Sequence, residues 1–113
     1  MFYPKSKPEI KIIDQEPQTN EEELKEKIGQ MIIIGFRGIE INKDSQIVKD
    51  INDLNLGGII LFDIDNPTKT FPRHIINYIQ TKKLISDIKE LSSSNIFVSI
   101  DAEGGLVNRL KEK

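Results

Sequence analysis

The chain has 113 residues, of which 16 are basic and 18 acidic, so its net charge is -2 at pH 7. This balance lacks the basic excess typical of a nucleic-acid-binding protein, and we expect no nucleic-acid partner. The absence of cysteine excludes disulfides and thiolate metal sites, and it fits a reducing compartment. No apolar run approaches the roughly 20 residues of a membrane-spanning helix, and the first residues show no secretory signal. We therefore expect a cytoplasmic protein without a membrane span.

Residues 1–20 are predicted to form a mobile amino-terminal arm, because three prolines interrupt a polar and charged stretch. A helix is predicted to follow this arm. Asn20 can cap it, and Glu23 stands at the spacing of a capping box. The apolar residues of this helix recur at helical spacing at Leu24, Ile28 and Met31.

Three short apolar runs rich in β-branched residues are predicted to be strands: residues 31–36, 57–62 and 96–100. The first two resemble strands buried on both faces, which is the pattern of parallel sheets. Helices are predicted between them, the first beginning near Asp44 or Ser45 and the second near Asn77. Their apolar faces consist of Ile47, Val48, Ile51 and Leu54 in the first and Leu84, Ile85, Ile88 and Leu91 in the second.

This alternation of helices and strands predicts an α/β fold with parallel strands and crossover helices. Three strands cannot close a barrel, and a complete eight-stranded α/β barrel takes about 250 residues. The pattern alone leaves two architectures open: a small open sheet, or part of a barrel.

Functional sites in parallel α/β folds form beyond the carboxyl ends of the strands. Asp101 directly follows the third predicted strand, so its carboxylate is placed to accept hydrogen bonds from ligand hydroxyl groups. Gly104 and Gly105 would let the chain turn sharply or approach a ligand closely. Arg109 could return to the same pocket and bind ligand oxygens or a carboxylate. The alternative is a strand-to-helix turn, with Asp101 as a cap and Arg109 on the surface.

Two other polar features have structural interpretations that we favour. His74 is the only histidine, and we interpret it as structural or solvated. Asp63 and Asp65 begin a long polar loop over residues 63–73. They could line a site or hold a cation, but a solvated turn is the favoured interpretation. No cluster has convincing metal-ligand spacing, and we expect neither a metal nor a cofactor.

Three segments together resemble glycoside hydrolase family 3, in its β-N-acetylglucosaminidase branch. Residues 101–110, DAEGGLVNRL, resemble the motif D-x-E-G-G-R-V-x-R-L. Residues 27–36, KIGQMIIIGF, and residues 57–62, GGIILF, resemble the motifs of the first and second strands of the family. The resemblance covers residues 21–113, with one departure: Leu106 stands where the family has arginine.

The resemblance implies that residues 21–113 are the first three strand/helix units of a TIM-like (β/α)8 barrel, incomplete in this chain. It implies hydrolysis of terminal β-linked N-acetylglucosamine, from peptidoglycan or chitin fragments, with retention of configuration. By the motif, Asp101 and Arg109 would bind the sugar, and Glu103, Gly104 and Gly105 would shape the site.

The nucleophilic aspartate and the acid/base histidine loop of the family follow later in its barrel and have no counterpart in this sequence. We therefore expect no catalytic residue here and no hydrolysis by the chain alone. The expected partners are an N-acetylglucosamine-containing sugar and the remaining part of a barrel. The chain would then be a truncated gene product, one half of a split gene, or an isolated piece. A non-catalytic carbohydrate-binding or interaction module is the alternative.

Overall fold

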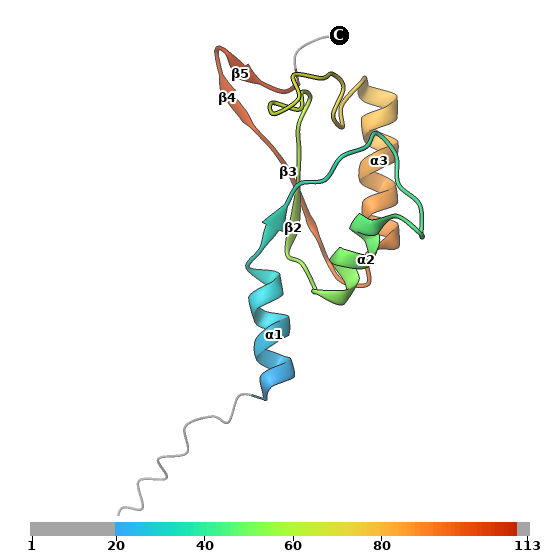
Figure 1. Ribbon diagram of the computed structural model, residues 1–113, viewed down its shortest axis with the longest axis vertical. Coiled ribbons are helices and arrows are strands. Elements are labelled where there is room, and N and C mark those ends of the chain that lie inside the picture. Colours follow the sequence, from blue (N-terminus) through green and yellow to red (C-terminus); the bar gives the residue numbers. More distant parts are fainter. Residues whose placement is uncertain (1–19, 111–113) are drawn as a thin grey trace, which may run out of the picture.

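A computed structural model describes residues 20–110, so the arm predicted over residues 1–20 lies outside the described residues except for Asn20. The fold is mixed α/β, as predicted, and its main sheet is parallel with the strand order β1-β2-β3 (Figure 1). The helices are α1 (Glu21–Gln30), α2 (Gln46–Asp53) and α3 (Tyr78–Leu91). The strands are β1 (Ile33–Ile34), β2 (Gly58–Leu61), β3 (Phe97–Ile100), β4 (Ala102–Gly104) and β5 (Val107–Asn108).

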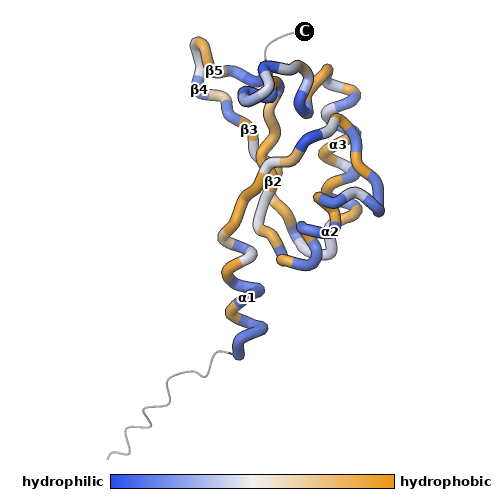
Figure 2. The backbone as a smooth tube through the Cα atoms, in the orientation of Figure 1, coloured by the Kyte–Doolittle hydropathy of each residue, from blue (hydrophilic) through white to orange (hydrophobic). Residues whose placement is uncertain are grey.

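The hydrophobic core lies between the sheet and two helices, α2 and α3, on one of its faces (Figure 1). Successive side chains of a strand point to opposite faces, and in β2 both Ile59 and Leu61 are buried in this core. Figure 2 shows the hydrophobic residues gathered along β1 and β2. The remaining buried apolar residues are Ile47, Val48 and Ile51 of α2, Leu84 and Ile88 of α3, and Leu56, Ile75 and Ile96.

The opposite face of the sheet is open in the described part of the chain. Ile33 and Phe97 both pair with Gly58, and they are 53% and 78% exposed. A Cβ atom at Gly58 would lie 3.0 Å from Ile33 Cγ1 and 3.4 Å from Phe97 Cβ, so these two side chains flank the glycine. The prediction that the strand over residues 31–36 is buried on both faces is therefore wrong, because Ile33 is exposed on this face of the described sheet.

The first predicted strand is shorter than expected. Residues 31–36 contribute only the two residues of β1, since Met31 is the carboxyl-terminal cap of α1. Figure 1 shows α1 extending from one end of the sheet, away from α2 and α3. The Gln30 side chain holds α1 by donating a hydrogen bond of 2.9 Å to the carbonyl of Asn55. The Gly57 N–H donates to the carbonyl of Gly29 at 3.0 Å.

The helix starts follow the sequence closely. Ser45 is the cap of α2, and Asn77 caps α3 by accepting a hydrogen bond of 2.9 Å from the Gln80 N–H. Asn20 caps α1 through the Glu22 N–H rather than through the N–H of Glu23. Some residues of the predicted apolar faces are misplaced: Leu54 ends α2 as its cap and is exposed, and Leu24, Ile28 and Met31 of the first predicted helix are exposed as well.

The sequence did not predict the hairpin that β4 and β5 form after the main sheet. Gly104 and Gly105 lie at its turn with φ values of +78° and +60°, which favour glycine because a Cβ is strained there. The alternative in which Asp101 caps a helix is therefore wrong within residues 20–110, where an antiparallel pair follows β3 instead. None of the helices in the described residues combines the length and apolar character that crossing a membrane requires.

Candidate functional site

The loop over residues 63–73 folds back on itself at the carboxyl end of β2. The Arg73 N–H donates to the carbonyl of Asp63 at 2.9 Å, and the Asp65 N–H donates to the carbonyl of Thr70 at the same distance. The His74 N–H donates to the carbonyl of Phe62 at 3.0 Å. These hydrogen bonds hold the end of the loop beside its start, next to Phe62, the residue that precedes the loop.

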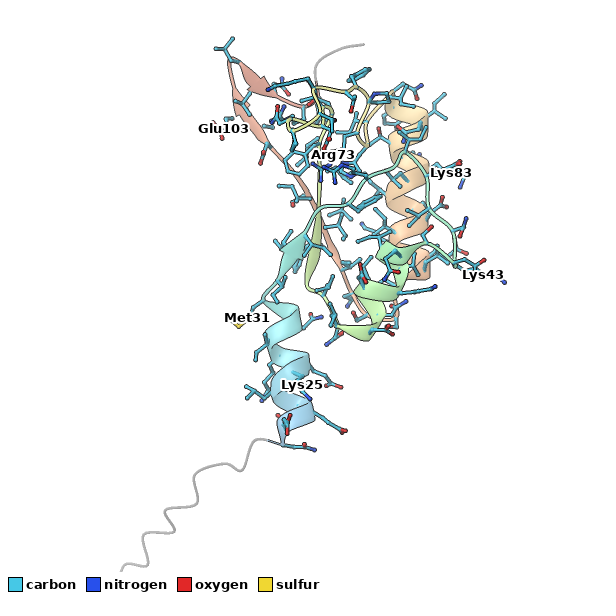
Figure 3. All side chains as sticks on the ribbon, in the orientation of Figure 1. Lys25, Met31, Lys43, Arg73, Lys83 and Glu103 are labelled. Atoms are coloured by element: carbon cyan, nitrogen blue, oxygen red, sulfur yellow. The ribbon has the colours of Figure 1, made fainter. Side chains whose placement is uncertain are left out.

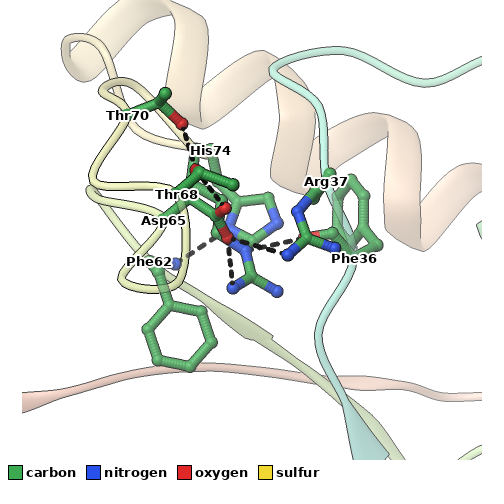
Figure 4. A network of polar contacts seen from close by, with 8 residues as sticks. Phe36, Arg37, Phe62, Asp65, Thr68, Thr70 and His74 are labelled. Atoms are coloured by element: carbon green, nitrogen blue, oxygen red, sulfur yellow. Dashed lines mark hydrogen bonds and ion pairs between the residues drawn. The ribbon is translucent and has the colours of Figure 1, made fainter.

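Asp65 is the centre of the polar network in this loop (Figure 4). It is only 3% exposed, and its Oδ1 lies 3.1 Å from Arg73 Nη1 and 3.3 Å from Arg37 Nη2. Thr68 donates a hydrogen bond of 2.5 Å to its Oδ2. This hydrogen bond lowers the pKa of Asp65, and the two guanidinium groups lower it further, although burial opposes them. The interpretation of Asp65 as part of a solvated turn is therefore wrong.

Arg73 joins the ends of β1 and β2. Its Nε donates to the carbonyl of Phe36 at 2.9 Å, and its guanidinium carbon lies 4.9 Å from the centroid of the Phe62 ring. A Cβ atom at Gly35 would lie 3.2 Å from Arg73 Nη2, so the absence of a side chain at Gly35 makes room for the Arg73 guanidinium. Figure 3 shows Arg73 directed into this end of the molecule, in contrast to the outward lysines.

His74 is fully buried, in agreement with a structural role. Its Nδ1 accepts a hydrogen bond of 2.9 Å from the Phe62 N–H, and its ring centroid lies 4.4 Å from that of Phe36. Its carbonyl accepts a hydrogen bond of 2.8 Å from the Gln80 side chain at the start of α3. Burial lowers the pKa of His74, and the positive charge of Arg73 adds to this, while main-chain groups of Phe36 and Phe62 partly oppose it.

Asp101 and Arg109, the two predicted sugar-binding residues, lie next to each other through the main chain. Asp101 directly follows β3, and its carbonyl accepts a hydrogen bond of 3.3 Å from the Arg109 N–H. The guanidinium of Arg109 is instead bound to Asp63, with Nη1 3.0 Å from Oδ1. The carboxylate of Asp101 is half-buried and has no hydrogen bond or ion pair to another residue between 20 and 110.

The three predicted site-shaping residues lie on the hairpin. Gly104 ends β4 and Gly105 begins the turn, and a Cβ atom at either position would meet nothing within 4 Å. Glu103 is exposed in β4 and projects away from the polar network (Figure 3). The structure therefore brings Asp101 and Arg109 together but leaves Glu103 apart from them.

The carboxyl end of β3, with Asp101 and Arg109, is called the edge below. It combines a carboxylate of Asp101 that no described residue binds with a guanidinium of Arg109 that Asp63 holds in place. A carboxylate accepts hydrogen bonds and a guanidinium donates them, so the pair suits a ligand rich in hydroxyl groups. Within the described ranges, no three histidine, aspartate or glutamate residues lie close enough to hold a metal ion.

Sequence reasoning underestimated the loop residues that support this edge. Asp63 holds Arg109, and Asp65 holds Arg37 and Arg73. The available signal was the close succession of acidic residues directly after a buried strand, together with an arginine at the other end of the same loop. It was not decisive, because Asn66-Pro67 is also typical of a solvated turn.

Comparison with known proteins found no match to this chain among protein-family models, curated proteins or solved structures. The geometry of the edge and the motif resemblance both concern the same two residues, Asp101 and Arg109.

Proposed function

We propose that this chain supplies a sugar-binding edge of a glycosidase of the β-N-acetylglucosaminidase type. In this proposal residues 21–113 are the first three strand/helix units of a TIM-like barrel of glycoside hydrolase family 3. The observation that carries it is the contact of Asp101 with Arg109 at the carboxyl end of β3. The motif D-x-E-G-G-R-V-x-R-L, from which this chain departs at Leu106, puts the sugar-binding residues at these two positions.

Each residue has a defined role in the proposal. The carboxylate of Asp101 accepts hydrogen bonds from sugar hydroxyl groups, since it is not bound to another described residue. The guanidinium of Arg109 donates to an oxygen of the same sugar. The hairpin turn that follows Gly104 brings Arg109 back to Asp101.

The proposal gives the chain sugar binding but not cleavage. Retaining hydrolysis requires a nucleophile and an acid/base group on opposite sides of the glycosidic bond. Glu103 is exposed on the hairpin, and its closeness to Asp101 in the sequence does not make the two such a pair. We therefore assign neither catalytic role to a residue of this chain.

The test is a titration of the isotope-labelled chain with N-acetylglucosamine, followed by NMR. We expect the amide signals of residues 101–109 to shift and the Asp101→Asn variant to bind at least about tenfold more weakly, the equivalent of 1.4 kcal/mol. Asp44→Asn is the matched control, because it removes a carboxylate from an exposed loop. A chromogenic β-N-acetylglucosaminide should remain uncleaved. Absence of binding by the folded chain, or equal binding by Asp101→Asn, contradicts the proposal.

The open face of the sheet favours a second function as an interaction module. Ile33 and Phe97 leave an apolar surface uncovered beside Gly58. Such surfaces mark interaction sites or assembly interfaces in soluble proteins. This function is compatible with the first, because the remaining part of a barrel would bind at the same face.

A further inference from the structure

The ion pair between Asp63 and Arg109 joins two segments that are 46 residues apart in the sequence. Both side chains are shielded from solvent, with exposed fractions of 16% for Asp63 and 18% for Arg109. Arg109 also lies against the Phe62 ring, with its guanidinium carbon 5.9 Å from the ring centroid. Ion pairs shielded in this way are screened less by salt than exposed pairs are. The pair therefore fixes both the direction and the local charge of the guanidinium.

The charge of Arg109 is compensated, whereas Arg37 and Arg73 share a single carboxylate. Arg37 and Arg73 are both bound to Asp65, and Arg109 is bound to Asp63. The carboxylate of Asp101, beside Arg109, adds a negative charge that no described cation neutralises. A ligand that reaches Arg109 thus meets a guanidinium whose charge Asp63 balances, beside the unbalanced carboxylate of Asp101.

We infer that Asp63 is a positioning and specificity-determining residue: it orients Arg109 and neutralises its charge, so that the edge selects uncharged sugars over sugar acids. This inference rests on the proposed function, in which Arg109 donates to the sugar. An arginine without an acidic partner binds carboxylates strongly, often through two hydrogen bonds. With Asp63 on Nη1, the guanidinium offers fewer donors, and a ligand carboxylate is repelled by both Asp63 and Asp101.

An ion pair with a purely structural role would also connect the hairpin to the end of β2. The test must therefore separate the effect of the negative charge of Asp63 from its effect on the position of Arg109. Asp63→Asn does this, since asparagine keeps an oxygen that accepts a hydrogen bond from Arg109 but removes the negative charge. Asp87→Asn is the matched control. Its carboxylate is 20% exposed, similar to that of Asp63, but it is bound to Lys83 on α3. Asp63→Glu retains the charge and serves as a second variant.

The experiment is an NMR titration of the full chain with two sugars that differ at one carbon. They are N-acetylglucosamine and the uronic acid formed by oxidation of its C6 hydroxymethyl group to a carboxylate. We expect wild type to bind the neutral sugar about tenfold more tightly, a difference of 1.4 kcal/mol. Asp63→Asn should bring the ratio of dissociation constants close to one, mainly through tighter binding of the acid. Asp87→Asn and Asp63→Glu should keep the wild-type ratio.

The outcomes separate this inference from the proposed function. If wild type binds both sugars equally, or Asp63→Asn binds with an unchanged ratio, the inference is wrong and the sugar-binding function stands. If folded wild type binds neither sugar, both are wrong. Should Asp63→Asn fail to fold, the ratio measured for wild type and for Asp63→Glu still decides, since both must prefer the neutral sugar.

Discussion

The main-chain N–H of Phe62 donates a hydrogen bond of 2.9 Å to Nδ1 of His74, and the His74 N–H returns one of 3.0 Å to the carbonyl of Phe62. Because Nδ1 accepts, the ring is neutral and carries its proton on Nε2. Protonation at Nδ1 would set two N–H groups against each other. The two hydrogen bonds between Phe62 and His74 therefore close the loop over residues 63–73 only while His74 is uncharged.

The hydrogen bond from the Phe62 N–H to His74 Nδ1 predicts that the chain loses stability on mild acidification. The pKa of His74 is lowered by burial in the folded state, so the unfolded chain binds a proton more readily. The free energy of unfolding should thus be constant above the unfolded pKa of about 6.5 and fall below it, until the pH passes the folded pKa. The loss is at most about 1.4 kcal/mol per pH unit. Urea unfolding at pH 7.5, 6.5 and 5.5 measures it.

His74→Gln is the control for this prediction, because His74 is the only histidine of the chain. The variant should be less stable than wild type at pH 7.5, since it loses the bond to Nδ1. Its stability should then change little between pH 7.5 and 5.5. A variant with the same pH dependence as wild type would show that another group causes the effect.

Removal of the Asp65 carboxylate should release the loop. Asp65→Ala leaves Arg37 and Arg73 without their shared partner and Thr68 without its acceptor. We expect a lower melting temperature and faster hydrogen exchange of the amides in residues 65–73. Asp53→Asn is the control, because its carboxylate is exposed at the end of α2.

The same carboxylate predicts a second, more acidic transition. The pKa of Asp65 is lowered in the folded state, first by the Thr68 hydroxyl and then by the arginines. Its contribution is therefore present above the unfolded pKa of about 3.9 and is lost as the pH falls through the folded value. An equal decline of wild type and Asp65→Ala below pH 4 would contradict this assignment.

The sequence predicted best those elements whose signals are local. Asn77 and Gln80 stand at the spacing that a helix start requires, and α3 begins between them. Ile47, Val48 and Ile51 repeat at helical spacing and are buried. In such cases the residues that decide the structure lie within a few positions of each other.

The features that sequence reasoning missed depend on distant residues. The burial of Asp65 could not be predicted without knowing that it binds Arg37, which follows a different strand. The burial of Ile33 was expected from its apolar neighbours, but whether a strand face is covered depends on what packs against it. The motif assigns Asp101 and Arg109 to one site, but only the structure places Asp63 on the guanidinium of Arg109.

Gly29 is predicted to be essential for the attachment of α1. A Cβ atom at this position would lie 1.9 Å from the carbonyl oxygen of Leu54 and 2.8 Å from that of Asn55. Both neighbours are main-chain atoms, so Gly29→Ala should separate α1 from the turn after α2 and cost about 1–3 kcal/mol in overpacking. Although alanine favours helix by about 1 kcal/mol, the clash should dominate. Urea unfolding measures the net change.

Glu22→Ala provides the comparison for Gly29→Ala, since it adds helix propensity at an exposed position of α1. It should leave the stability within about 0.5 kcal/mol of wild type. NMR should also show perturbed amides at Asn55 and Gly57 in Gly29→Ala alone, because these residues bind α1. A Gly29→Ala variant as stable as wild type would mean that α1 does not contact this turn in solution.

The open face of the sheet predicts concentration-dependent self-association. Phe97 is 78% exposed on an edge strand, beside Ile33 and Gly58. Burial of a phenylalanine contributes about 1.5–3 kcal/mol, and unpaired edge strands favour association. Phe97→Ser should therefore raise the dissociation constant of the associated form by about tenfold or more. Sedimentation equilibrium over a range of protein concentrations measures this constant.

Leu106→Ser is the matched control for Phe97→Ser. Leu106 is more exposed than Phe97, but it lies at the tip of the hairpin rather than on the sheet. If apolar exposure alone drives association, both variants should weaken it to a similar degree. If the sheet face is the interface, Phe97→Ser should weaken association and Leu106→Ser should not. Ile33→Ser should then act like Phe97→Ser, because Ile33 flanks the same glycine. A wild-type chain that stays monomeric at every concentration would show that the exposed face does not bind a second copy.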